Sequence, residues 1–419
     1  MPSMAIRHLI HLLNAPSAVA AVHQLSAEET RIGRDLPLPG LTVSDARMSR
    51  THARLRWNDR SIFVVVEDLG SKNGVFVNGQ RTISRALADG DVIRLGDTVI
   101  AYEQAPATAC APAPEFASPG IFSGPSVAAA RLRRDLEAVR ESTAPLLFYG
   151  ESGSGRESAA RLLHARRSST GAFTLVRSSP AAPLDVKALD ATLSLSGAHS
   201  ADTLYVDGLA DVEPDAQLAL VRLLAEASER RPHVVVASTF DLRVGTLASR
   251  VLPDLASRLL PHMISVPSLR RRRPDIVAVL RHLTGDVRLT GDACEGLAIA
   301  GWPGNLRELV SVIRRASTAP SIDGRLDLDA LPEVFSRPIR RRLTAPQTTT
   351  VAFSRPSAAD LAAALDRFEG RVADVAIHYQ KSRLQIMRWM ERYGIPVPGG
   401  VTGVADVTET ASSELFELD

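Results

Sequence analysis

A glycine-rich loop lies between a short apolar run and an amphipathic stretch near the middle of the chain. The run APLLFYG (144–150) has the length and composition of a buried strand, and ESGSGRES follows it directly. A strand that enters a helix through such a loop is typical of a βαβ unit. ADTLYVDG and PHVVVAST repeat the strand pattern, with amphipathic stretches between them. Residues 121–335 are therefore expected to form a parallel α/β sheet followed by a helical lid.

The preceding residues, 1–103, follow a different pattern. Short β-rich runs, among them IFVVVEDL, GVFVNG and DVIRLGDTVIAYE, alternate with glycine and asparagine turns. This pattern is typical of an antiparallel β-sandwich. Asn14 and Pro16 interrupt the apolar N-terminal stretch, so we expect two strands joined by a turn there rather than a signal peptide.

Changes of composition divide the chain further. Residues 104–120 are rich in alanine and proline, and residues 336–357 combine arginine, threonine and proline; both compositions are typical of linkers. Residues 358–395 have the apolar spacing of three short helices. The tail 396–419 has five acidic residues and no basic one, which predicts an acidic disordered segment.

Composition restricts the protein class. No apolar run approaches the roughly 20 residues needed to cross a bilayer, so no membrane partner is expected. Cys110 and Cys294 cannot form a disulfide framework and have no partners at metal-ligand spacing, which favours a cytoplasmic location. Because the net charge is only +2, any nucleic-acid contact needs a local basic cluster.

Three stretches of the first domain occur in a fixed order: RIGRD, SRTHARL and DLGSKNGVFVNG. Together they closely resemble the forkhead-associated (FHA) domain, a phosphothreonine-binding β-sandwich. A phosphothreonine has about two negative charges and three acceptor oxygens, which suit a guanidinium group, a hydroxyl group and backbone N–H groups. The resemblance implies that Arg34 and Ser49 bind the phosphate, that Arg50 and Lys72 flank it, and that Asn73 holds the peptide backbone. Without a ligand these would be ordinary turn residues of an inert sandwich.

The resemblance gives His52 a different part from the binding residues. It matches the histidine that orders the binding loop in FHA domains. The expected partner is a phosphothreonine protein or the chain's own second linker, where Thr344 and residues 348–350 are threonines.

The second domain resembles the AAA+ domain of sigma-54-dependent transcription activators. The matching stretches, in order, are LLFYGESGSGRE (Walker A), ADTLYVDG (Walker B), VVVASTFDL (sensor I), LPDLASRLL with VPSLRRRRPDI (arginine-finger region) and GWPGNLREL (sensor II). The resemblance implies weakly held ATP or ADP with Mg²⁺. The implied nucleotide-binding residues are Gly150, Glu151, Ser152, Gly153, Ser154, Gly155, Arg156, Glu157, Asp207 and Arg307, with Asp207 also the implied Mg²⁺ ligand.

The catalytic groups of that family are incomplete here. Arg156 stands in place of the Walker A lysine, Gly208 in place of the Walker B glutamate, Phe240 in place of the polar sensor I residue, and Leu252 in place of one finger arginine; Arg258 matches the other. Phosphoryl transfer depends on positioning and electrostatics, so losing several such groups should cost many-fold in rate. We expect a scaffold with no catalytic residue, in which the glycine loop still suits phosphate.

The family's sigma-54-gripping loop is also missing from its expected place. GAFT (171–174) resembles the start of that GAFTGA loop, but Leu175 and Val176 follow it, and its surroundings match a strand instead. The stretch between Arg156 and Asp207 contains no other copy. Contact with sigma-54 polymerase is therefore not expected.

The end of the third domain resembles the helix-turn-helix that closes sigma-54 activators. Ser382 would cap the recognition helix, and Arg383, Gln385 and Arg388 would reach bases or phosphates of promoter DNA. Residues 337–395 contain eleven lysines and arginines against five acidic residues, which suits phosphate contact. Because single helix-turn-helix units bind weakly, we expect a homo-oligomer.

The combined prediction is a multidomain transcription regulator in which phosphothreonine binding controls a DNA-bound scaffold. It would act as a repressor, competitor or co-regulator. Two alternatives remain open at the level of sequence. One is an active, ATP-dependent sigma-54 activator, and the other is a phosphothreonine adaptor that does not bind DNA.

Overall fold

The computed structural model describes most of the two main domains and part of the C-terminal one. The described residues are 6–15, 22–25, 29–36, 40–57, 64–106, 120–167, 170–196, 201–226, 231–244, 250–285, 287–316, 324–333, 356–367, 372, 375 and 383–395. The chain divides into two compact units, Met1–Thr344 and Ala345–Asp419. The acidic tail and most of both expected linkers lie outside the described residues.

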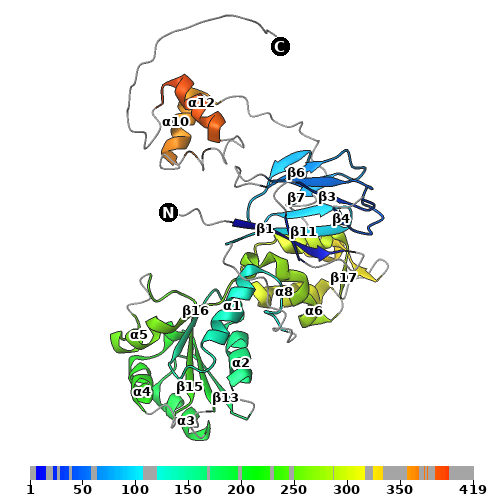
Figure 1. Cartoon of the computed structure of the whole chain (residues 1–419). Helices are drawn as coiled ribbons and strands as arrows, with labels where there is room; N and C mark the ends of the chain where they lie inside the picture. The colour runs from blue at the N-terminus through cyan, green and yellow to red at the C-terminus, as the bar shows by residue number, and fades with distance from the viewer. Residues whose placement is uncertain are drawn as a thin grey trace, which may run out of the picture. The chain divides into compact units, whose positions relative to one another are not determined.

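The first unit begins with a sandwich of two sheets (Figure 1). One sheet has the order β2 (Val22–Gln24), β1 (Ile6–Asn14), β11 (Thr98–Pro106), β10 (Val92–Leu95), β7 (Val75–Val77), β8 (Gln80–Thr82). The other has the order β4 (Leu41–Thr42), β3 (Glu29–Gly33), β5 (Ala53–Arg56), β6 (Val65–Asp68), β9 (Ser84–Ala86). The predicted sandwich is confirmed. β1 and β2 pair antiparallel as expected, and β11 runs to Pro106, so its last residues fall within the segment expected to be a linker.

The sandwich is apolar on both faces of one sheet. Ile93, Ile100 and Tyr102 point into its own core. Val92, Val99 and Ala101 alternate with them along β10 and β11 and join the core of the following domain. In an antiparallel sheet with one face in water, apolar and polar side chains alternate and only the inner face is buried. Because both faces are buried here, a second layer must cover the outer face.

The following domain contains a parallel sheet, as predicted. Its order is β13 (Phe173–Arg177), β14 (Thr203–Asp207), β15 (His233–Ser238), β12 (Leu146–Tyr149), β16 (Met263–Ser265), and all neighbouring pairs are parallel. Helices α1 (Val127–Ala138) and α2 (Arg156–Arg167) cover one face. α3 (Val186–Ser196), α4 (Pro214–Ala225) and α5 (Pro253–Leu259) cover the other (Figure 1).

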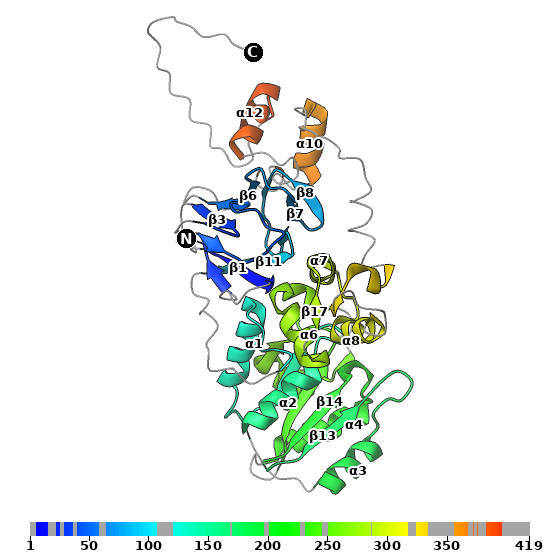
Figure 2. The same ribbon diagram turned by 90° about the vertical axis from the view of Figure 1, so that its right-hand side faces the viewer.

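A helical lid follows the sheet (Figure 2). It consists of α6 (Ile276–Thr284), α7 (Gly291–Ile299) and α8 (Asn305–Ala316), with the short parallel strands β17 (Arg288–Leu289) and β18 (Arg325–Leu326). Single 3-10 turns occur at Leu209–Asp211, Leu260–His262, Leu269–Arg271, Arg273–Asp275 and Leu328–Ala330. The predicted order of sheet and lid is confirmed.

The second unit contains helices α10 (Ala358–Arg367) and α12 (Arg383–Tyr393). Their apolar faces form a small core that includes Leu361, Ile386 and Met390. Ser357 Oγ accepts a hydrogen bond from the Asp360 N–H group, which caps the start of α10. The middle helix of the expected three lies outside the described residues. No helix within the described part of the chain is both long and apolar enough to span a bilayer.

Candidate phosphate-binding sites

A buried histidine joins two loops at one end of the sandwich. His52 Nδ1 accepts a hydrogen bond from the Ser49 N–H group (3.0 Å), and Nε2 donates to the Gly74 carbonyl (3.1 Å). This pattern requires a neutral ring with its proton on Nε2. Burial lowers the pKa of His52 and so favours this form. The histidine therefore orders the loops from within, as expected, and does not face a ligand.

The predicted phosphate-binding loops are hydrogen-bonded to one another. The Arg34 N–H group donates to the Ser49 carbonyl (3.0 Å), and the Lys72 N–H group donates to Ser49 Oγ (3.1 Å). Gly33 allows this approach, since a Cβ atom there would lie 2.0 Å from the Arg50 carbonyl oxygen. Arg34, Arg50 and Lys72 are exposed while Ser49 is half-buried. The fold thus groups three exposed cationic residues around one hydroxyl.

Asn73, the fifth predicted residue of this site, is also exposed. Its side-chain Nδ2 donates to the Arg47 carbonyl at 2.5 Å. The amide that would hold a peptide backbone is therefore bonded to the chain's own backbone. The second N–H of this amide and its Oδ1 remain for a ligand.

The glycine loop of the α/β domain has the shape of a phosphate cradle. Gly153 and Gly155 have φ angles of +73° and +103°, and α2 begins immediately after them at Arg156. Ser154 Oγ is buried and has no hydrogen-bond partner among the described residues. An orphaned hydroxyl at a helix N-terminus suits a phosphate oxygen. The backbone of this site therefore fits the phosphates of a nucleotide.

Two residues that sequence reasoning missed hold this loop. Asn305 Nδ2 donates to the Ser152 carbonyl (2.9 Å), and Arg270 forms an ion pair with Glu151. Asn305 lies in GWPGNLREL, where its φ angle of +51° marks a special turn. The sequence signal was the asparagine itself, because this residue type tolerates the left-handed conformation.

Arg156 turns back toward the loop and the neighbouring strand. Its Nη1 donates to the carbonyls of Gly150 (2.5 Å) and Glu151 (3.1 Å), and its Nη2 lies 3.2 Å from Asp207 Oδ1. The Arg156 side chain is only 10% exposed. The positive charge in the Walker A position is therefore already neutralised by the Walker B carboxylate.

This ion pair decides how well Mg²⁺ fits. Asp207 is the implied ligand, but its carboxylate already binds a guanidinium group. Among the described residues, no group of three or more His, Cys, Asp or Glu side chains is arranged to hold a metal ion. Nucleotide phosphates fit the loop, whereas Mg²⁺ would have to compete with Arg156 for the Asp207 carboxylate.

The substitution at Gly208 changes the backbone as well as the side chain. Gly208 has a φ angle of +89°, and a Cβ atom there would lie 2.1 Å from the Ser178 carbonyl oxygen. Any residue with a side chain, including the glutamate of the family, therefore clashes in this conformation. The water-positioning group is lost together with the space for it.

The other replaced positions serve packing. Phe240 and Leu252 are half-buried and pack against the core beneath α4 and α5.

The retained residues lie at the surface. Arg258 is exposed on α5, and Arg307 is exposed on α8 with its Cβ near Gly153. Glu157, in the first turn of α2, forms ion pairs with Arg161 and Arg177. The predicted nucleotide residues thus do gather around one loop.

A cavity of about 300 Å³ lies beside α2. Residues 120–123, α2 and α6 contribute to its lining, including Ile121, Phe122, Leu162 and His282. It is partly open and mostly apolar at its walls, so it suits a flat organic group better than a second phosphate.

In the second unit the structure describes three of the four predicted DNA-contacting residues. Arg383, Gln385 and Arg388 all lie on α12, and Arg388 is exposed. Ser382 lies outside the described residues. These positions agree with one helix but leave the turn before it undescribed.

Comparison with known proteins identifies the two domains that carry these loops. A family model of the FHA domain matches residues 30–96, and a model of the sigma-54 interaction domain matches residues 123–269. The response regulator protein PilR of Pseudomonas aeruginosa is 32% identical over 220 residues, which are 45% of this chain and 49% of PilR. The transcriptional regulatory protein ZraR of Escherichia coli K12 is 31% identical over 230 residues, 46% of this chain and 51% of ZraR.

A solved structure of NtrX from Brucella abortus in complex with ATP is 23% identical and covers 65% of this chain and 68% of NtrX, with a TM-score of 0.42. The chain spans about half the length of the curated relatives it matches. The two domain matches show that the chain contains an FHA domain and, after it, a sigma-54 interaction domain.

Proposed function

We propose that the chain is a transcription regulator that reads a phosphothreonine signal through its FHA domain, binds promoter DNA through its C-terminal unit, and does not remodel sigma-54 polymerase by hydrolysing ATP. The observation that carries this proposal is the contrast between its two phosphate sites. Arg34, Arg50 and Lys72 are exposed around Ser49, whereas Arg156 is paired with Asp207. The cationic residues of the FHA site are therefore accessible to a phosphate group, whereas the Walker A cation is already paired with a carboxylate of its own domain.

The phosphothreonine site rests on Arg34 and Ser49. A guanidinium group and a hydroxyl group bind a phosphate dianion strongly when the loops that carry them are preorganised. The hydrogen bonds from His52 and the backbone bond from Arg34 to Ser49 supply that order. The partner is a phosphothreonine protein or a phosphorylated threonine of the second linker.

An oriented peptide library with one fixed phosphothreonine tests this site on the full chain. We expect binding that requires the phosphate and is lost in Arg34→Ala. Arg31→Ala is the matched control, because Arg31 is an exposed arginine of β3, the strand that ends just before Arg34, and pairs with Glu29 instead. Phosphate-independent binding, or none, would refute the site.

The AAA+ domain acts in this proposal as a nucleotide-holding scaffold. The orphaned Ser154 hydroxyl and the glycine backbone support weak binding of ATP or ADP phosphates, and the cavity beside α2 has room for the base. Hydrolysis needs a positioned water and a metal ion; Gly208 and the Arg156–Asp207 pair provide neither. An ATP turnover assay on the full chain decides this point. Turnover that disappears in Asp207→Ala would overturn the scaffold proposal.

DNA binding is proposed for Ser382, Arg383, Gln385 and Arg388. The exposed Arg388 and the basic balance of residues 337–395 support phosphate and base contacts. A helix-turn-helix normally binds as a dimer to half-sites one helical turn apart, so a homo-oligomer is part of the proposal.

Duplexes selected from random sequence by the full chain provide the probe for this unit. We expect the double variant Arg383→Ala plus Arg388→Ala to lose the selected duplex, while Arg392→Ala, an exposed arginine at the end of α12, retains it. Binding that persists in the double variant would refute the assigned helix.

A further inference from the structure

The FHA domain packs directly on the lid of the AAA+ domain. Val92, Val99 and Ala101 of the sandwich belong to the same apolar core as Leu297 of α7 and Ile313 of α8. This core buries side chains from both domains, including positions that are fully buried. The sandwich is therefore a docked layer of the α/β domain.

A buried ion pair anchors this contact. Arg94 Nε of β10 donates to Glu295 Oε2 of α7 at 2.7 Å, and Glu295 Oε1 accepts from the Gly79 N–H group at 2.6 Å. Arg94 also lies 3.2 Å from Asp292 and over the Phe76 ring. Two segments of the FHA domain thus converge on one side chain of the lid.

The start of α7 rests on the turn between β10 and β11. A Cβ atom at Gly291 would lie 2.8 Å from Asp97 Cα, and Asn14 Nδ2 donates to the carbonyls of both Asp97 and Leu289. The Asp97 carboxylate lies 3.7 Å from Arg325 Nη1 on β18. Any movement of this turn is therefore transmitted to the lid.

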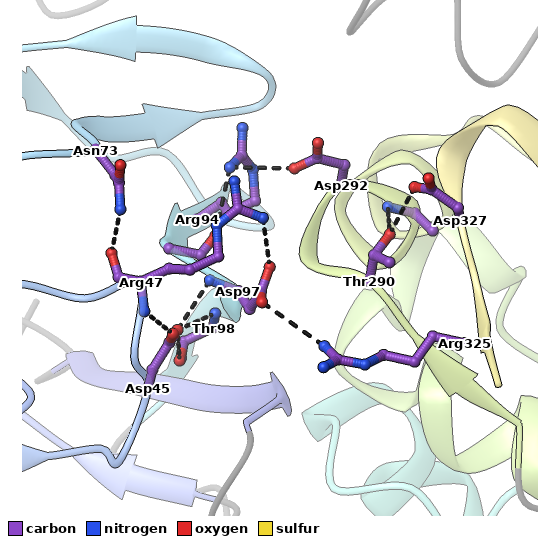
Figure 3. A network of polar contacts seen from close by, with 12 residues as sticks. Asp45, Arg47, Asn73, Arg94, Asp97, Thr98, Thr290, Asp292, Arg325 and Asp327 are labelled. Carbon is purple, nitrogen blue, oxygen red and sulfur yellow. Dashed lines mark hydrogen bonds and ion pairs between the residues drawn. The ribbon is translucent and has the colours of Figure 1, made fainter. Parts of the chain in front are cut away.

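The same turn is connected to the phosphothreonine loops (Figure 3). The buried Asp45 carboxylate accepts from the N–H groups of Arg47, Asp97 and Thr98 and from the Thr98 hydroxyl, all within 2.9 Å. Arg47 Nη1 donates to Asp97 Oδ1 at 3.0 Å, while the Arg47 carbonyl accepts from Asn73. Arg47 therefore touches the predicted peptide site with its backbone and the lid interface with its side chain (Figure 3).

We propose that Arg47 couples the two sites, so that a phosphothreonine peptide bound to the FHA loops loosens the docked lid. A peptide carbonyl bound by Asn73 competes with the Arg47 carbonyl for the amide N–H groups of Asn73. The phosphate dianion also competes with Asp97 for the Arg47 guanidinium, whose side chain is 57% exposed and free to turn. The Asp97 carboxylate then loses its cation from the FHA loops at the turn that supports Gly291. This inference rests on the proposed phosphothreonine site.

Amide hydrogen exchange of the full chain tests the coupling, using the peptide selected from the phosphothreonine library. We expect exchange within Gly291–Ile299 and at Arg325–Leu326 to become at least about fivefold faster with the peptide, the lower range of allosteric coupling. The unphosphorylated peptide should have no effect. In Arg47→Gln we expect fast exchange before the peptide is added and little further response, while Arg31→Gln behaves as the wild type.

A lid variant checks the same coupling from the other side. Glu295→Gln weakens docking without altering the predicted phosphothreonine residues, and reciprocity requires that it then binds the peptide more tightly, by at most the factor with which the peptide loosens the lid. If the wild type binds the peptide while exchange stays unchanged or slows, the coupling is wrong and the phosphothreonine site stands. If no phosphothreonine peptide binds, the proposed function itself fails.

Discussion

Removing one partner of the buried pair between the domains should weaken their docking strongly. The Arg94 side chain is 7% exposed and that of Glu295 is 0% exposed, so Arg94→Met leaves a buried carboxylate with the Gly79 N–H group as its remaining described donor. Breaking such a pair from one side costs about 3–5 kcal/mol, whereas replacing both partners by apolar residues is often close to neutral. We therefore expect Arg94→Met to destabilise the lid by this amount and Arg94→Met plus Glu295→Met to restore most of it.

The loss of docking free energy caused by Arg94→Met should depend on pH. Burial raises the pKa of Glu295 above its ordinary 4.5, and Arg94 opposes that rise. In Arg94→Met the pKa in the docked state rises further, so docking favours the protonated acid. Stability that is present at low pH is then lost as the pH rises from about 4.5 through the docked-state pKa. The penalty should accordingly be smaller near pH 5 than near pH 8.

Trp302 gives a local readout for this experiment. It is buried in the lid, and its Nε1 donates to the Leu297 carbonyl of α7. Urea titrations followed by fluorescence, with Trp57→Phe and Trp389→Phe in every variant, report the lid. Arg54→Met is the control, because Arg54 pairs with Glu67 on a partly exposed surface and should cost no more than about 1 kcal/mol. A cost of Arg94→Met as small as that, or one independent of pH, would refute the reasoning.

Three further predictions concern the phosphate sites. Gly208→Glu should lower the melting temperature and yield no ATP turnover, because its Cβ meets the Ser178 carbonyl at 2.1 Å; a stable, hydrolysing variant would contradict this. Arg156→Lys should bind a fluorescent ADP analogue several-fold more tightly, since the single ammonium nitrogen of lysine cannot bridge the Gly150 carbonyl and Asp207 as the two guanidinium nitrogens do, and an unchanged affinity would argue against the ion pair as the obstacle. His52→Ala should lower phosphothreonine-peptide affinity at least about tenfold, or roughly 1.4 kcal/mol, with little change in Trp302 unfolding, and equal affinity would show that the loops order themselves.

Local patterns in the sequence predicted the folds of both main domains. The strand, glycine loop and helix around residue 150 are contiguous, so their geometry follows from backbone preferences alone. The FHA loops were predicted for the same reason: each stretch is short and contains its own turn residues. The direction taken by Arg156 was not predictable, because a long side chain chooses among neighbours that are distant in sequence, and Asp207 lies on another strand.

The docked interface was missed although one signal was present. The run DVIRLGDTVIAYE is apolar at consecutive positions, which exceeds what one buried face needs. That pattern indicates that another part of the protein packs on the outer face of this sheet, but it does not identify that part. The partner, Glu295, lies about two hundred residues away on α7, and only the folded chain brings it to Arg94.

The shared core also determines how these two domains can change over generations. Here Val92, Val99 and Ala101 are buried against the lid, so deleting or replacing the sandwich would expose an apolar face on α7. A substitution that changes the volume of these side chains must therefore be matched by a compensating change on the lid, so the sandwich and the lid constrain each other's sequences.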